Sequence, residues 1–203
     1  MADFYLLGNS TYSQMLGCVI ITDSKTVVID GGAQGDRDQL YNFLKENAQG
    51  RVDAWLFTHA HHDHIGAFCE LCYAYPDIEI SAIYHDFPDF DILRDKGSRG
   101  EWETSLWKRT EELFNTRYRN IIHCVKKGDT LTFDDLTLTV LRTYNKEITW
   151  NFVNNSSVVY RIDGEKRSIL ILGDLGEEGG ENQDIFEKNL HQCIQLAIHP
   201  LLR

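Results

Sequence analysis

The stretch "WLFTHAHHDHIGAF", residues 55–68, constrains the fold more than any other part of the chain. Four of the eight histidines and an aspartate occupy the six positions from His59 to His64. A short apolar run precedes them, and residues 65–75 have the spacing of a buried helix that ends before Pro76. The pattern predicts a loop between a strand and a helix. Because imidazole and carboxylate groups are ligands for zinc and similar divalent ions, we expect this loop to hold metal.

Length and charge limit the classes of protein to which the chain can belong. Its 203 residues are enough for one domain, which we expect to span residues 1–203. Lysine and arginine number 20 against 31 acidic residues, and the net charge of −11 argues against general nucleic-acid binding. The N-terminus lacks the pattern of a signal peptide, and no window approaches the ~18 apolar residues of a membrane span. We therefore expect a cytoplasmic protein without membrane contact.

The cysteines indicate reduced thiols. There are five, an odd number, and they are spread from Cys18 to Cys193, which is not typical of a disulfide framework. Cys69 and Cys72 form a C-x-x-C pair, but a zinc site of that kind needs a second pair. We interpret them as two thiols on one face of the helix at residues 65–75.

The order of the remaining elements predicts a mixed α/β fold. Helical spacing and β-branched runs alternate in the first half, and strands dominate from residue 121 onward. Helices are expected at residues 36–50, 65–75, 98–118 and 183–190. Strands are expected at residues 18–22, 26–30, 52–58, 78–84, 121–125, 130–133, 136–144, 157–162, 167–173 and 193–198.

With these elements in place, the sequence resembles the metallo-β-lactamase fold family. The family motif H-x-H-x-D-H is matched by His59, His61, Asp63 and His64. Three further segments follow the family pattern in the same order: "VIDGG" at 28–32, "VKKGDTLTFDDLTLTVLRT" at 125–143 and "ILILGDLG" at 169–176. The resemblance implies a four-layer α-β-β-α sandwich with mixed sheets and a metal site at its edge.

The resemblance also implies a set of metal ligands. His59 and His61 would hold a first ion, Asp63 and His64 a second, and Asp174 would bridge the two. His199 would be the remaining ligand of the second ion. Asp174 also stands out from its own context, because it follows an apolar run and a glycine and so emerges at the end of a strand. The expected cofactors are two divalent metal ions, with zinc favoured and manganese or iron as alternatives.

The chemistry implied is that of a metal-dependent hydrolase that uses a metal-bound hydroxide. Two ions close together lower the pKa of a shared water and polarise the substrate. Asp63 is the expected catalytic residue, orienting the hydroxide or accepting its proton. Because the ions reverse the local negative field, we expect a small anionic substrate, a phosphoester or another small ester. The alternative is an impaired or non-catalytic relative that binds metal or a ligand.

One ligand of the family is missing. Many members carry another histidine after the strand here placed at 136–144, and this chain has none there. The segment at Asn154, Asn155 and Ser156 is most similar to the branch related to the competence-protein hydrolase domain, in which an N-x-S segment opens the next strand. An asparagine oxygen is a poor zinc ligand, so we expect the first site to be the weaker one or to suit manganese. The alternative is an ordinary polar loop that leads into a strand.

The C-terminal end and two further histidines complete the predictions. The chain stops four residues beyond His199, where the related branch continues through another helix and strand. We therefore expect a fold that is incomplete at the C-terminus, or a homodimer that covers the exposed apolar surface. His85 and His123 lie outside the motif, and we expect them to be packed or solvated rather than to bind metal.

Overall fold

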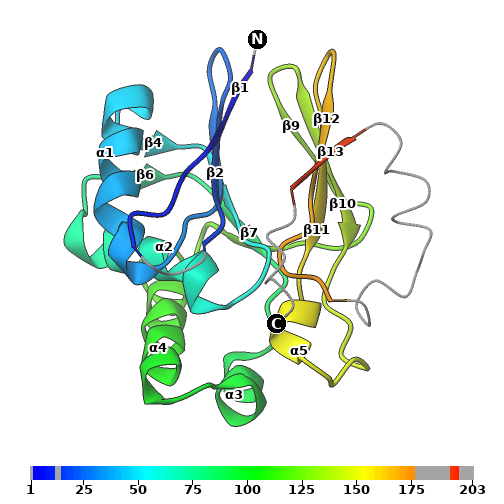
Figure 1. The fold of residues 1–203 in the computed structure, drawn as a ribbon. Helices are drawn as coiled ribbons and strands as arrows, with labels where there is room; N and C mark the ends of the chain where they lie inside the picture. Colours follow the sequence, from blue (N-terminus) through cyan, green and yellow to red (C-terminus); the bar gives the residue numbers. More distant parts are fainter. Residues whose placement is uncertain (1, 12–14, 177–192, 197–203) are drawn as a thin grey trace.

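Two mixed β-sheets face each other in the computed structural model, which describes residues 2–11, 15–176 and 193–196 (Figure 1). The larger sheet has the order β1-β2-β3-β5-β7-β8, formed by Asp3–Leu6, Gly17–Ile21, Thr26–Asp30, Ala54–Leu56, Ile83–His85 and Ile122–Cys124. The smaller sheet has the order β13-β12-β11-β10-β9, formed by Cys193–Leu196, Ser168–Ile171, Val159–Asp163, Leu136–Arg142 and Thr130–Phe133. In the larger sheet, strands β3, β5, β7 and β8 run parallel, whereas β1, β2 and β3 are antiparallel neighbours.

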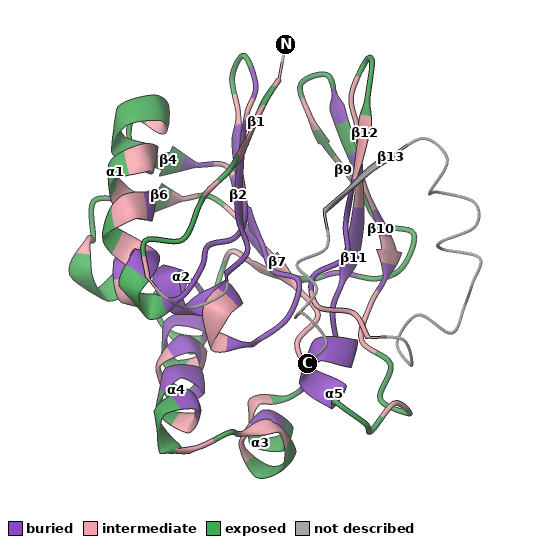
Figure 2. Ribbon diagram, in the orientation of Figure 1, coloured by how far each residue is buried: buried purple, intermediate pink, exposed green. Residues whose placement is uncertain are grey.

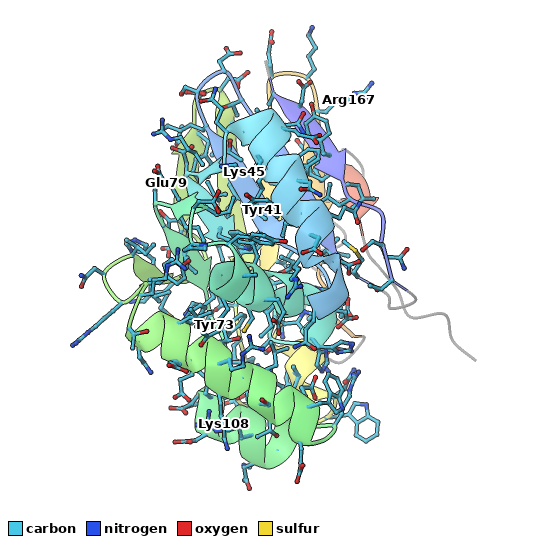
Figure 3. All side chains as sticks on the ribbon, turned by 90° about the vertical axis from the view of Figure 1, so that its left-hand side faces the viewer. Tyr41, Lys45, Tyr73, Glu79, Lys108 and Arg167 are labelled. Carbon is cyan, nitrogen blue, oxygen red and sulfur yellow. The ribbon has the colours of Figure 1, made fainter. Side chains whose placement is uncertain are left out.

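Helices cover the outer face of the larger sheet. These are α1 (Arg37–Ala48), α2 (His62–Ala74) and α4 (Glu101–Asn115), which lie side by side in Figures 1 and 3. Their solvent-facing side is polar and aromatic, as Tyr41, Lys45, Tyr73 and Lys108 show in Figure 3. The shorter elements are η1 (Gln34–Asp36), α3 (Phe90–Ile92), the π-turn η2 (Leu93–Gly97), α5 (Phe152–Asn155) and the strand pair β4 (Arg51–Val52) and β6 (Glu79–Ile80). Among the described residues, no helix is long and apolar enough to cross a membrane.

The core consists of layers that follow the alternation of side chains along each strand. In β3, Val28 packs toward the helices, whereas Val27 and Ile29 pack toward the smaller sheet. Trp55 in β5 faces the helices in the same way, with Leu56 on the other side. A period of two places neighbouring side chains on opposite faces of a strand. The buried surfaces therefore lie between helices and sheet and between the two sheets, as Figure 2 shows.

The predicted α/β sandwich with mixed sheets is confirmed. The described residues form three of its four layers: the helices on the larger sheet and the two sheets themselves. The helix predicted at residues 183–190, which would belong to the fourth layer, lies outside the described residues. Val159, Leu170 and Leu172 form a small buried cluster on the other face of the smaller sheet, where that layer is expected.

Several boundaries differ from the predictions. The strand predicted at residues 78–84 is two strands, because Glu79 pairs with Arg51 in the separate β4–β6 pair while β7 pairs with β5. Helix α2 begins at His62, so its first turn contains the end of the histidine motif. The N-x-S segment leads into strand β11 (Val159–Asp163), but its first two residues belong to the short helix α5. Strand β1 and the elements α3, η2 and α5 were not predicted.

Candidate metal centre

The histidine motif lies at the edge of the sandwich, between the end of β5 and the first turn of α2. Strand β5 pairs in parallel with β3, so the residues that follow both strands meet at the same edge of the sheet. Helix α2 is seated closely on the segment after β3: Ala67 N donates to Gly32 O at 2.9 Å. A Cβ atom on Gly66 would lie 2.6 Å from Gln34 N, so only glycine permits this approach. The backbone of the motif is therefore held on both sides.

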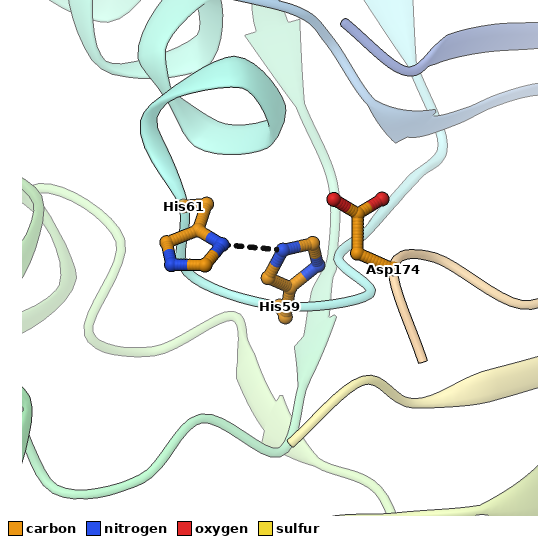
Figure 4. Close-up of side chains that lie close together, drawn as sticks. All are labelled: His59, His61 and Asp174. Carbon is orange, nitrogen blue, oxygen red and sulfur yellow. Dashed lines mark hydrogen bonds between the residues drawn. The ribbon is translucent and has the colours of Figure 1, made fainter. Parts of the chain in front are cut away.

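His59, His61 and Asp174 form the first of two groups of potential ligands (Figure 4). His59 Nε2 and His61 Nδ1 are 3.0 Å apart, and one ligand atom from each of the three residues lies within 4.8 Å of the others. Two nitrogen atoms on a tetrahedral zinc ion would be about 3.3 Å apart, given zinc–nitrogen bonds of about 2.0–2.1 Å. Burial lowers the pKa of both histidines well below the usual value, and nearby positive charge lowers it further. Both rings are therefore neutral, the form that binds metal.

Asp63, His64 and Asp174 form the second group, with ligand atoms within the same 4.8 Å. His64 Nε2 lies 3.3 Å from Asp174 Oδ1. The side chain of Asp63 is 16% exposed, which leaves it partly open to solvent. Asp174 belongs to both groups, so one carboxylate joins them.

A buried aspartate behind the motif fixes its orientation. Asp30, at the end of β3, accepts hydrogen bonds from Thr58 N at 2.8 Å and Thr58 Oγ1 at 2.7 Å. His64 Nδ1 lies 2.8 Å from Asp30 Oδ2, which leaves His64 Nε2 directed toward Asp174. Burial lowers the pKa of His64, but the charges of Asp30 and Asp174 and the hydrogen bond to Asp30 outweigh it and raise the pKa well above its usual value. In many metal sites, a carboxylate accepts a hydrogen bond from the ring nitrogen of a histidine that does not bind the metal, and so orients the ring.

Asp174 comes from the smaller sheet, and Gly173 allows it to reach the motif. Gly173 has φ of 57°, a conformation that favours glycine. A Cβ atom at this position would lie 2.8 Å from Ser157 Oγ and 2.8 Å from Thr58 Cβ. The end of β12 therefore lies directly on the motif loop, and Asp174 stands beside His59 (Figure 4).

Asn154 stands beside the two histidines of the first group. Its side chain is close enough to raise the pKa of both His59 and His61, against the larger effect of burial. The Asn155 side chain instead forms hydrogen bonds with the backbone: its Nδ2 donates to Trp150 O at 2.8 Å and its Oδ1 accepts from Gly176 N at 3.0 Å. Of the two asparagines that were left as alternatives, Asn154 is the one at the site.

The donor set fits a divalent metal ion. Asp174 Oδ1 and Asn154 Oδ1 are both buried, and within the described part of the chain neither accepts a hydrogen bond. Buried acceptors are normally satisfied, so two orphaned oxygens beside neutral imidazoles call for a cation. Imidazole, carboxylate and amide oxygen ligands together suit zinc, manganese or iron.

The other histidines take different positions. His62 belongs to neither group: its ring packs edge-on against Trp102, with centroids 4.7 Å apart, and its Nδ1 lies 3.6 Å from Asp63 Oδ1. His85 is packed against Phe87, its Nδ1 accepts a hydrogen bond from Phe87 N, and burial lowers its pKa to about 4. His123 stacks on Tyr84. None of these three belongs to a ligand group among the described residues.

Two other predictions concern residues near the motif and at the C-terminus. His199 lies outside the described residues, so its role as a ligand stays a prediction. Cys69 and Cys72 are free and buried in α2, where burial raises the pKa of the first to about 11 and of the second to about 12. The prediction that Cys69 and Cys72 are reduced thiols of this helix is confirmed.

The family model of the metallo-β-lactamase superfamily matches residues 18–202, which is most of the chain. The chain belongs to the metallo-β-lactamase superfamily. Its membership agrees with the fold and with the two groups of His and Asp ligands at the edge of the sandwich. No curated protein shows significant sequence similarity to this superfamily member.

Solved structures of the same fold are similar to this chain. The metallo-β-lactamase fold protein YhfI from Bacillus subtilis has a TM-score of 0.51 at 16% identity, over 85% of this chain and 62% of that one. A B3 metallo-β-lactamase with an active-site glutamic acid has a TM-score of 0.54 at 15% identity, over 84% and 59%. A putative metallo-β-lactamase from Thermotoga maritima has a TM-score of 0.56 at 15% identity, over 85% and 78%. The chain thus spans less than two thirds of the length of the first two, and these likenesses concern the fold.

Sequence reasoning missed the residues that support the ligands. Asp30 was noted only as part of "VIDGG", although an aspartate at a strand end before two glycines is a usable signal. Arg142 was not singled out at all. It is buried, and its guanidinium donates to Asn155 O at 2.8 Å and Ser157 O at 2.9 Å, so it fixes the segment that carries Asn154. No local pattern distinguishes this arginine from a solvent-facing one.

Proposed function

We propose that the chain is a metal-dependent hydrolase with two divalent ions, acting on a small anionic ester such as a phosphoester. The observation that carries this proposal is that Asp174 is shared by two groups of ligands, His59 with His61 and Asp63 with His64, whose ligand atoms lie within 4.8 Å. A shared carboxylate between two such groups is the arrangement expected of a two-metal hydrolytic site. Zinc is the favoured metal, with manganese or iron as alternatives.

The residues of the site divide the chemistry among them. When bound, the ions supply an acidified water and polarise the substrate oxygen. Asp63, which is partly exposed, is the carboxylate that would accept the proton. Asp30 keeps His64 turned toward Asp174, and the neutral rings of His59 and His61 bind without first losing a proton. Burial of the three histidines excludes bulk water and strengthens these interactions.

Asn154 supports the finer assignment to the competence-protein hydrolase-like branch. It lies in the segment where the resemblance implies a histidine in many family members, and its oxygen is buried and without a hydrogen-bond donor among the described residues. An amide oxygen is a harder ligand than imidazole, so this group favours manganese more than an all-histidine group would. We therefore propose that the first ion is the more weakly held of the two.

The same substitution supports a second candidate function. If the first group holds no ion at cellular metal concentrations, the chain is a metal- or ligand-binding relative that turns over slowly or not at all. The two candidates differ in metal content and in rate, so they can be separated by one set of measurements.

The test combines bound metal with turnover. Purified protein is loaded with zinc or manganese, metal per chain is measured by mass spectrometry, and hydrolysis of bis(p-nitrophenyl) phosphate is followed. We expect close to two ions per chain and turnover that Asp63→Ala abolishes, with Glu46→Ala, an exposed change on α1, as the control. One ion or none, without turnover, supports the non-catalytic candidate.

A further inference from the structure

Arg99 lies in the loop between η2 and α4, and a buried glutamate holds its backbone. Glu103, in the first turn of α4, is 0% exposed, and its Oε2 accepts a hydrogen bond from Arg99 N at 2.9 Å. A glutamate near the start of a helix often reaches back to such a backbone N–H. This contact fixes the position at which the Arg99 side chain leaves the backbone.

Two further contacts seat the same loop against the histidine motif. Glu103 Oε1, the other carboxylate oxygen, is buried and lies 4.0 Å from His62 Nδ1. Trp102 packs edge-on against the same His62 ring. The indole of Trp102 also lies over the loop, because a Cβ atom on Gly100 would be 3.2 Å from Trp102 Nε1. The loop that carries Arg99 is therefore attached to the residue between His61 and Asp63.

The guanidinium of Arg99 is exposed and forms no hydrogen bond or ion pair within the described part of the chain. Other arginines of this acidic protein are paired, for example Arg94 with Glu111 and Arg109 with Glu70. Glu103 and Trp102 hold the Arg99 loop against His62, which lies between the ligands His61 and Asp63 in the sequence, so the positive charge of Arg99 lies near the site. A cation so placed opposes the binding of metal ions unless an anion lies between them.

We propose that Arg99 binds the anionic group of the substrate beside the metal ligands and that Glu103 is the positioning residue that holds it there. The inference rests on the proposed function and specifies its substrate class, an ester with a phosphate or carboxylate group. The planar guanidinium offers two parallel donors to either group. The hydrogen bond from Arg99 N to Glu103 fixes the backbone of residue 99. The fixed backbone holds the Arg99 guanidinium in a position where it can bind an anion.

The first test measures anion binding without turnover. Inorganic phosphate and, separately, acetate are titrated into manganese-loaded protein by calorimetry. Arg99→Ala should weaken binding of the preferred anion about tenfold or more, and Arg99→Lys should weaken it less. Arg119→Ala is the control, because Arg119 is an exposed arginine just beyond the other end of α4. Affinities within about twofold of the unmodified protein for both anions, or an unmodified protein that binds neither, would overturn the inference.

The second test separates binding from rate. With bis(p-nitrophenyl) phosphate, Arg99→Ala should raise KM by about tenfold with kcat nearly unchanged, and with neutral p-nitrophenyl acetate it should change neither. Equal losses on both substrates would mean a general structural effect and would refute the assignment. If no ester is hydrolysed but Arg99→Ala still weakens phosphate binding, the proposed function fails while Arg99 remains the anion-binding residue.

The role of Glu103 is tested by paired variants. Glu103→Gln keeps an oxygen that can accept from Arg99 N, so phosphate affinity should stay within about threefold. Glu103→Ala removes the acceptor and should reproduce most of the loss seen for Arg99→Ala. If Glu103→Ala does not fold, Glu103→Gln alone decides: a loss as large as that of Arg99→Ala contradicts a positioning role through this hydrogen bond.

Discussion

The two sheets contribute to the metal centre in different ways. The larger sheet supplies a continuous motif of six residues, His59 to His64, whose three buried histidines are held by Asp30, Thr58 and the start of α2. The smaller sheet side supplies two separate oxygens, those of Asp174 and Asn154, which accept no hydrogen bond among the described residues. We call the histidine motif, with Asp30 and Thr58 behind it, the framework side. We call Asp174 and Asn154 the completing side, because their oxygens would complete the coordination of a metal ion. If the site holds two ions as we propose, Asp174 would be the ligand that both share.

The largest expected effect comes from removing the shared carboxylate. Asp174→Ala should lower metal content at both groups and reduce turnover about a thousandfold or more, because both ions lose a ligand. His61→Ala, on the framework side, should remove one ion only. Metal per chain by mass spectrometry distinguishes the two variants. If Asp174→Ala retained one ion at full occupancy, the carboxylate would not be shared.

Removing the support behind the motif should have the next largest effect. Asp30→Asn should weaken metal binding about 10- to 100-fold, because the amide cannot hold both Thr58 and His64 as the carboxylate does. The matched control is Asp134→Asn. Asp134 also has positive φ and accepts from Thr22 Oγ1 and Ser24 N, but it does so in the β9–β10 turn, away from the histidines. Equal losses in the two variants, measured by chelator competition, would contradict a specific role for Asp30.

The loss of unfolding free energy that histidines cause at low pH should also come from the larger-sheet side, because residues 126–176 contain no histidine. Burial lowers the pKa of His85 to about 4, against about 6.5 in the unfolded chain. As the pH falls, the His85 imidazole is therefore protonated in the unfolded chain before it is protonated in the folded protein. The free energy of unfolding decreases as the pH is lowered from about 6.5 toward 4. His85→Gln should remove about 2 kcal/mol of the loss in unfolding free energy between pH 7 and pH 5.

Urea denaturation at the two pH values measures this effect. His123→Gln, a change at an exposed histidine of the neighbouring strand β8, serves as the control. An unchanged pH dependence in His85→Gln would show that His85 is not the group responsible.

The smallest expected effect concerns the oxygen of Asn154. Asn154→His should tighten zinc binding at the first group about tenfold, since imidazole is the softer and more basic ligand. Asn154→Ala should weaken binding at the same group. Titration against a chromophoric zinc chelator resolves both changes. If neither variant shifts zinc affinity, Asn154 contributes no ligand and the first group is completed in another way.

The framework side could be predicted from the sequence because its information is local. The motif, the strand before it and the helix after it are contiguous, and the nearly continuous burial of β2 and β3 follows directly from their apolar runs. Strand 78–84 was mispredicted because the change of partner between β6 and β7 depends on neighbours that are distant in sequence. Strand β1 has only four residues, half-buried or exposed, and carries little apolar signal.

The completing side was predicted only in part. Asp174 could be found because it follows a buried strand and a glycine. The choice between Asn154 and Asn155 could not be made, since adjacent residues of a helical turn point about 100° apart and packing decides which one faces the site. That packing includes the hydrogen bonds of Arg142, which no local pattern reveals. His199 and residues 183–190 lie outside the described part of the chain.

The shared position of Asp174 also has a consequence for biosynthesis. The histidine motif leaves the ribosome long before Asp174, so a partly made chain presents several ligands without the carboxylate that joins them. Both groups of ligands form only after β12 has joined the smaller sheet and Gly173 has been seated against Thr58. Pairing of such distant segments is a late event in folding, because a long loop must close first. Tight metal uptake therefore reports that the two sheets have docked.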